Sequence, residues 1–194
     1  MSVDMGVEIE KKYRIEHERK ESIRERLRAM GAVLRGEDFE ENVIYAGGEL
    51  DPRRRILRLR RVGDTATLAY KERFSSASSI KHQREDETPV GDPVALANIL
   101  DALGFKPALV YEKRRETWDA SGALVTLDEL PFGFYLEIEG NEGAITRIEE
   151  LLGLSETDVE AATYPELASQ RGSKRGSMVE ARFFEGGEGQ TRSR

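Results

Sequence analysis

Charged residues spaced two apart along predicted strands constrain the fold of this chain more than any other feature of its sequence. Successive side chains of a strand point to opposite faces of a sheet, so residues i and i+2 share a face. Five segments place charges in this way, and the groups are Glu8, Glu10 and Lys12; Arg58 and Arg60; Glu85 and Glu87; Lys113 and Arg115; and Glu137 and Glu139. Apolar residues such as Leu57, Leu59, Leu136 and Ile138 occupy intervening positions. The spacing predicts a sheet with one ionic face and one apolar face.

The ionic face has two interpretations. It could be the solvated side of an antiparallel sheet, but same-sign neighbours repel one another and need counter-charges. Alternatively, the sheet closes with its charges inward. The resulting tunnel would be lined by six bases and seven acids, which are Lys12, Arg58, Arg60, Lys71, Lys113 and Arg115 with Glu8, Glu10, Glu85, Glu87, Asp128, Glu137 and Glu139. Because an unpaired buried charge costs several kcal/mol, such a tunnel has to hold water and a charged ligand.

Hydrophobic periodicity and turn residues predict eight strands and four helices. The strands are expected at about 6–15, 41–46, 55–62, 65–74, 80–88, 108–118, 123–128 and 133–139, with a turn at 75–79. The first helix is expected to begin at about 17 and to stop near Gly31 or soon after, within an apolar pattern that runs to Leu34. Further helices are expected at 93–103, 144–152 and 156–170, the last after a Ser155-x-x-Asp158 capping box. Strands in hairpin-like order with helices between them are typical of an α+β fold, here with an antiparallel sheet that could close into a barrel with helices outside.

The chain length of 194 residues fits one domain, which we expect to span residues 1–170. Residues 171–194 are rich in Gly, Ser and mixed charge and have little apolar content, so we expect this tail to be disordered.

Net charge and the missing residue types exclude several classes of function. A formal net charge of -7 disfavours a general affinity for nucleic acid or for an anionic membrane. There is neither a long apolar run nor a basic leader, so we expect a cytoplasmic protein. The absence of cysteine excludes disulfides and thiolate chemistry, and two isolated histidines exclude a histidine-rich zinc site. The sequence leaves open whether the protein is a homodimer.

The chemistry of the charged residues points to a phosphate ligand with a metal. Clustered carboxylates are hard oxygen ligands of the kind that Mg²⁺ or Mn²⁺ takes, and Arg together with Lys can bind several phosphate oxygens. A polyphosphate with a divalent metal would satisfy both signs of charge. The glycine-rich phosphate loops of nucleotide-binding proteins are missing from the sequence.

The sequence resembles the CYTH superfamily, whose members are triphosphate tunnel metalloenzymes. The resemblance begins at Glu8-Ile9-Glu10-Lys11-Lys12, a Glu-x-Glu-x-Lys signature, and covers about 7–167. Later landmarks follow in order, and they are Leu57-Arg58-Leu59-Arg60, Ala69-Tyr70-Lys71, Glu85-Asp86-Glu87, Leu103-Gly104-Phe105, Glu112-Lys113-Arg114-Arg115, Leu127-Asp128 and Leu136-Glu137-Ile138-Glu139. Tyr164-Pro165-Glu166-Leu167 is similar to the C-terminal helix motif of the CyaB-type branch, which includes class IV adenylate cyclases and is related to thiamine triphosphatases. One departure is Gln83, where many relatives carry a base.

The resemblance implies a closed eight-stranded tunnel and Mg²⁺- or Mn²⁺-dependent cleavage of a triphosphate. It implies that Lys12, Arg58, Arg60, Lys71, Lys113 and Arg115 bind the phosphate chain. It assigns the metal to Glu8, Glu10, Asp128, Glu137 and Glu139. Catalytic roles go to Glu85 and Glu87, as second-site ligands or water-positioning groups, and to Lys12.

Three functions are compatible with this assignment. The first is hydrolysis of a phosphoanhydride bond in an inorganic, thiamine or nucleoside triphosphate. The second is a class IV adenylate cyclase, which converts ATP to cyclic AMP and pyrophosphate. The third is an inactive module that binds polyphosphate or nucleotide, against which the complete set of carboxylates argues.

Overall fold

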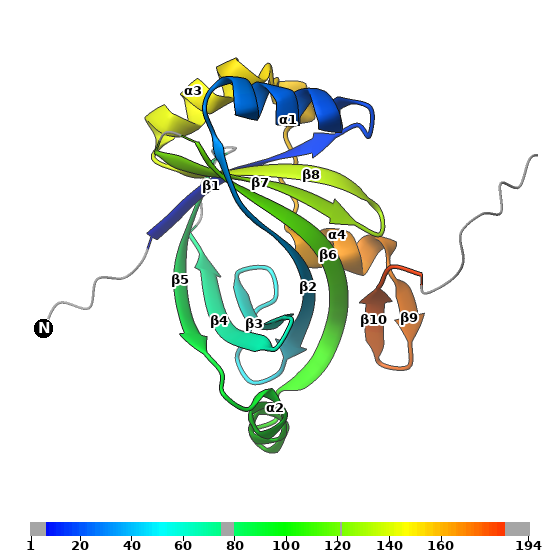
Figure 1. Ribbon diagram of the computed structural model, residues 1–194. Helices are drawn as coiled ribbons and strands as arrows, with labels where there is room; N and C mark the ends of the chain where they lie inside the picture. Colours follow the sequence, from blue (N-terminus) through cyan, green and yellow to red (C-terminus); the bar gives the residue numbers. More distant parts are fainter. Residues whose placement is uncertain (1–6, 75–79, 121, 185–194) are drawn as a thin grey trace, which may run out of the picture.

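A computed structural model describes residues 7–74, 80–120 and 122–184 of the chain (Figure 1). The strands of its barrel are β1 (Val7–Ile15), β2 (Val33–Ala46), β3 (Arg55–Val62), β4 (Thr65–Arg73), β5 (Lys81–Pro89), β6 (Lys106–Ala120), β7 (Ala123–Leu130) and β8 (Gly133–Gly140). The helices are α1 (Arg19–Ala29), α2 (Pro93–Ala102), α3 (Glu142–Leu152), the 3₁₀ turn η1 (Glu156–Asp158) and α4 (Tyr164–Arg171). Two short strands follow, β9 (Ser173–Arg175) and β10 (Met178–Ala181).

The eight strands β1 to β8 form a closed antiparallel barrel. Their order is β2-β3-β4-β5-β1-β8-β7-β6, and the pairing of β2 with β6 closes the ring. That closing pair is long, because β2 and β6 run side by side from the pair Val33–Asp119 to the pair Ala46–Lys106. The predicted α+β class and the closed eight-stranded barrel are therefore confirmed.

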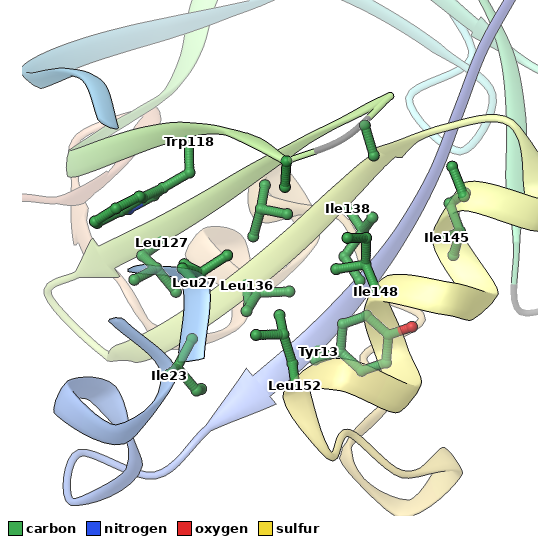
Figure 2. Close-up of a cluster of buried hydrophobic side chains, with 14 of the residues drawn as sticks. Tyr13, Ile23, Leu27, Trp118, Leu127, Leu136, Ile138, Ile145, Ile148 and Leu152 are labelled. Carbon is green, nitrogen blue, oxygen red and sulfur yellow. The ribbon is translucent and has the colours of Figure 1, made fainter. Parts of the chain in front are cut away.

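The apolar face of the barrel is covered from outside by helices. α1 and α3 lie together over β1, β7 and β8 (Figure 1). Ile23 and Leu27 of α1 and Ile145 and Ile148 of α3 pack in one cluster with barrel residues such as Leu136 (Figure 2). Each fully buried side chain of this kind contributes about 1.5–3 kcal/mol relative to an exposed one. At the opposite end, Leu59 packs in a cluster with Leu100 of α2. Helices thus take up the outward apolar residues, and the charges face inward.

The predicted helix that stops near Gly31 is confirmed at its C-terminal end. α1 ends at Ala29, and Gly31 adopts a left-handed backbone conformation with φ of 81°, which favours glycine and ends the helix. Leu34, whose spacing continues the helical pattern, lies instead in β2, where it pairs with Trp118 of β6. Pairing along the whole of β6 decides this segment, and such a long-range contact is invisible to local periodicity.

The predicted helix at 156–170 is shorter than expected. The Ser155–Asp158 box caps only the single 3₁₀ turn η1. The helix begins at Tyr164, where Thr163 and Glu166 form a second capping box and Pro165 stands in the first turn.

The expected disorder of the tail is wrong for its first part. β10 pairs in parallel with β6 at Leu109–Tyr111, and Ala181 is buried. The cause is the free edge of β6, because β7 pairs only with residues 114–120 and the backbone groups before them need partners. Arg182 then binds Glu41 and Glu112 at 2.7 and 2.6 Å. Residues 185–194 and the predicted turn at 75–79 lie outside the described residues.

None of the helices in the described part of the chain is long and apolar enough to cross a membrane.

Candidate active site in the barrel interior

A cavity of about 230 Å³ lies inside the barrel. Twelve of the thirteen residues predicted from the sequence line it, and they are Glu8, Glu10, Lys12, Arg58, Arg60, Lys71, Glu85, Glu87, Lys113, Arg115, Glu137 and Glu139. The exception is Asp128, which is buried behind Arg115. Gln83, Tyr164 and Pro165, which the sequence analysis named only as landmarks of the resemblance, also line the cavity. The sequence reasoning missed the remaining lining residues, which are Ile56, Tyr111, Leu124, Thr126 and Thr163.

Strand register brings opposite charges together in the interior. Lys71 of β4 stands opposite Glu85 of β5, and its ammonium group lies 2.7 Å from that carboxylate. The same ammonium donates a hydrogen bond of 2.9 Å to Glu8 of β1. Gln83 donates to the same Glu8 oxygen at 2.7 Å. The residue that departs from the family pattern therefore still faces the site, as a neutral hydrogen-bond donor.

The two arginines of β3 share one carboxylate. Arg58 donates to Glu87 at 3.1 Å and lies 3.6 Å from Glu85. Arg60 lies 3.4 Å from Glu87, and both of these side chains are partly exposed. The guanidinium groups of β3 are thus paired with acids of β5 and project two planar sets of donors toward the cavity.

Asp128 holds one of the interior cations in place. Its two oxygens accept hydrogen bonds of 2.7 and 2.5 Å from Arg115. Tyr164 donates a third hydrogen bond, of 2.7 Å, to the same carboxylate. Arg115 also donates to Glu137 at 2.7 Å. Both oxygens of Asp128 are occupied, so its contacts differ from those expected of a metal ligand.

Glu40 of β2 is a buried acid that the sequence analysis did not identify. It is 3% exposed and lies 3.3 Å from Lys113 and 3.9 Å from Arg115. Burial alone would raise the pKa of Glu40, but the charges of Lys113 and Arg115 outweigh it and lower the pKa to about 2. Glu40 and Asn42 are two residues apart and share one face of β2. A strand predicted to begin before residue 41 would have included Glu40 on that face.

The N-terminal turn of α4 closes the cavity on one side. Tyr164 is buried, and the Lys12 ammonium lies 3.8 Å from the centre of its ring. Lys12 also donates to the backbone oxygen of Ala162 at 3.1 Å and lies 3.4 Å from Glu137. The segment that carries the Tyr164-Pro165 motif is therefore part of the site.

Three carboxylates of the cavity crowd one another. The pKa values of Glu8, Glu10 and Glu139 are raised, mainly because burial disfavours their charged forms. Neighbouring acids raise the pKa further, and the largest contributors are Glu85 beside Glu8, Glu137 beside Glu10 and Glu8 beside Glu139. Burial and neighbouring acids together therefore disfavour the ionised forms of these three groups.

Lys81 is a further buried cation next to these acids. Its ammonium lies 3.6 Å from Glu10, and it has no hydrogen-bond partner within the described residues. Burial lowers the pKa of Lys81 to about 8, and the charge of Lys12 adds to the effect.

The carboxylates fit a hard divalent cation in chemistry, although they are not gathered into a ligand set. Within residues 7–74, 80–120 and 122–184, no three acidic or histidine side chains converge closely enough to hold a metal ion. Yet Glu8, Glu10 and Glu139 are buried oxygen donors with other acids beside them, and a divalent cation would stabilise their ionised forms.

Comparisons with known proteins agree with the barrel fold. The model of the CYTH domain matches residues 6–164. Among solved structures, the PH1012 protein of Pyrococcus horikoshii is 28% identical, with a TM-score of 0.71 over 82% of this chain and 98% of that one. A candidate adenylate cyclase of Vibrio parahaemolyticus is 21% identical, with a TM-score of 0.68 over 84% and 97% of the two chains.

A third structure is HpAC1 of Hippeastrum, described as a candidate adenylyl cyclase with a dominant triphosphatase activity. It is 18% identical, with a TM-score of 0.63 over 84% of this chain and 95% of that one. No curated protein matches the sequence. Since the family model covers most of the chain, from the first strand to the start of α4, the protein belongs to the CYTH family.

Proposed function

We propose that this protein is a metal-dependent triphosphatase, which uses water to cleave a phosphoanhydride bond of a triphosphate held inside the barrel. The observation that carries the proposal is the cavity inside the barrel, where four strands present six cations and acids stand among them. Membership of the CYTH family supports triphosphate processing in general, and the triphosphatase activity ascribed to HpAC1 supports hydrolysis.

The cations divide into two groups that would bind different parts of the phosphate chain. Arg58, Arg60 and Lys71 come from β3 and β4, while Lys113 and Arg115 come from β6. The guanidinium groups offer paired donors that match phosphate oxygens. Phosphate oxygens would replace Glu85 and Glu87 as partners of the β3 arginines and would free these two carboxylates.

Glu8, Glu10 and Glu139, with Glu137 beside them, would hold Mg²⁺ or Mn²⁺. The bound ion would neutralise negative charge on the phosphate oxygens. We assign Asp128 a different role from the one predicted, because it accepts hydrogen bonds from Arg115 and Tyr164. Asp128 would position Arg115 against the substrate.

The reaction needs a water molecule placed in line with the bond that breaks. In the proposed step, the water oxygen attacks the terminal phosphorus, and the bond from that phosphorus to the bridging oxygen breaks. The bridging oxygen leaves with the diphosphate, and inorganic phosphate is the other product. Glu85, once separated from Arg58, would orient the water and accept its proton, and Glu87 would assist. Lys12 and Lys113 would stabilise the charge that develops on the oxygens.

The test is a turnover screen with Mg²⁺ or Mn²⁺ and four substrates, which are tripolyphosphate, thiamine triphosphate, ATP and GTP. Phosphate, pyrophosphate and cyclic nucleotide are measured separately. We expect phosphate and the matching diphosphate, and no turnover in excess EDTA. If ATP alone reacts and yields only cyclic AMP and pyrophosphate, the protein is a cyclase and the hydrolytic proposal is wrong.

A further inference from the structure

A second cavity adjoins the charged one at the α4 side of the barrel. It has a volume of about 300 Å³ and shares Ile56 and Pro165 with the charged cavity as common walls. Its other walls come from β2, the β2–β3 loop, the start of β6 and α4, including Ile44, Leu50 and Leu109. A triphosphate in the charged cavity would therefore have a separate space beside it for whatever group the phosphates carry.

The walls of this second cavity are mostly apolar, and most of its charged groups already have partners. Arg55 donates to Glu72 at 3.1 Å. Glu166 accepts hydrogen bonds of 2.6 and 2.8 Å from the backbone and side chain of Thr163, its partner in the capping box. Arg53 is exposed, and its side chain forms no ion pair with any described residue. The cavity thus offers aliphatic surface and one uncompensated positive charge.

We propose that this second cavity binds the organic group of the triphosphate and selects an uncharged ring system, such as a nucleobase, over a cationic one. The proposal rests on the triphosphatase function proposed above. Apolar walls favour a flat ring through burial of its surface. A cationic ring would be repelled by Arg53. Its potential counter-ion, Glu166, already accepts hydrogen bonds from Thr163 and lies 3.9 Å from the guanidinium group of Arg73. The volume lies at the lower end of the roughly 300–1,000 Å³ of small-molecule sites, which suits one ring system.

A filling substitution tests whether the organic group lies there. Ser169 lies on the exposed surface of α4 and lines the second cavity, so Ser169→Trp should block it without disturbing the core. The matched control is Gln170→Trp, because the next residue is equally exposed and lies outside the lining. We expect Ser169→Trp to lower kcat/KM for ATP by about tenfold or more. Turnover of inorganic tripolyphosphate, which has no organic group, should be unchanged in both variants.

A charge reversal tests the selectivity. Wild-type protein should have a higher kcat/KM for ATP than for thiamine triphosphate, whose thiazolium ring carries a permanent positive charge. Arg53→Glu should lower the ratio of kcat/KM for ATP to kcat/KM for thiamine triphosphate several-fold, because the cationic ring then meets an anion in the wall of the second cavity. The control is Lys174→Glu, the same change of charge on an exposed residue of β9.

The possible outcomes separate this inference from the proposed function. If all three triphosphates are hydrolysed and Ser169→Trp affects ATP no more than Gln170→Trp does, the second cavity does not bind the organic group. An Arg53→Glu variant with the wild-type preference would refute the charge selection. If the wild-type protein hydrolyses no triphosphate and none raises its melting temperature, the proposed function fails, and the inference about the organic group fails with it.

Discussion

Replacing Glu40 by glutamine tests how strongly the interior cations depend on a buried acid that sequence reasoning missed. Glu40 is ionised beside Lys113 and Arg115, and its pKa falls from an ordinary value of 4.5 to about 2. The difference between these two values corresponds to roughly 3 kcal/mol of stability. Because the pKa is lower in the folded state than in the unfolded state, the contribution is complete above about pH 5 and is lost as the pH falls toward about 2.

Near neutral pH, Glu40→Gln should therefore lower the free energy of unfolding by about 3 kcal/mol. Loss of one partner of a buried ion pair costs about 3–5 kcal/mol, because the remaining charge is left without compensation. For a chain of this size, each kcal/mol corresponds to about 2–4 °C, so the melting temperature should fall by roughly 6–12 °C.

The assay is urea unfolding followed by the fluorescence of Trp118, the single tryptophan of the chain, at several values between about pH 7 and pH 3. The difference between wild type and variant should shrink as the pH falls. The control is Glu41→Gln, which changes the next residue on the opposite face of β2, where Glu41 pairs with Arg182 at the surface. Such exposed pairs contribute about 1 kcal/mol or less. Equal losses in the two variants, or a difference that is independent of pH, would refute the reasoning.

Three further predictions follow from the site and from the tail. At about 100 times the dissociation constant, tripolyphosphate with Mg²⁺ should stabilise the wild type by roughly 2.7 kcal/mol and raise its melting temperature. A thermal scan should show less than half of that rise in melting temperature for Arg60→Ala and the full rise for Arg54→Ala. Equal rises in the two variants would exclude Arg60 from the phosphate site. In the absence of metal, Glu10→Gln should have a melting temperature equal to or above that of the wild type, since burial and Glu137 already raise the pKa of Glu10. Measured by calorimetry, the same variant should bind Mn²⁺ about tenfold more weakly or worse, and an unchanged affinity would exclude Glu10 as a ligand. Truncation after Arg171 should lower the melting temperature by several degrees, because it removes β10 from the edge of β6, whereas truncation after Phe184 should not; equal behaviour of the two would mean that β10 contributes nothing.

The interior of the barrel could be predicted because it depends on strand faces alone. Arg58 and Arg60 alternate with Leu57 and Leu59, and any pairing that keeps the leucines under a helix turns the arginines inward. Closure then collects inward charges from separate strands in one space. Twelve of the thirteen predicted residues line the cavity for this reason, although the sequence contained no information on which carboxylate meets which base.

Pairwise contacts could not be predicted, since they depend on segments that are remote in sequence. The resemblance to the CYTH superfamily placed Asp128 among the metal ligands, whereas its carboxylate meets Tyr164, which is 36 residues later in the chain. Glu40 was missed because the long pairing of β2 with β6 extends that strand back to Val33, through a segment whose local periodicity is helical. The pairing of β10 was missed for the same reason. β7 pairs only with residues 114–120 of β6, and the free edge that remains for β10 at Leu109–Tyr111 cannot be read from local sequence.

The balance of charge in the interior determines how a triphosphate can enter it. Adding Glu40 and Lys81 to the thirteen predicted residues gives eight acids and seven bases in and around the cavity. Lys71 already pairs with Glu8 and Glu85, and Arg58 with Glu87. A bare polyanion would have to displace these carboxylates and leave them close together in a confined space, where salt screens poorly. A divalent cation that takes up Glu8, Glu10 and Glu139 removes this obstacle and frees Lys71 for phosphate. Metal and triphosphate should therefore bind with positive coupling, each increasing the affinity of the barrel for the other by the same factor.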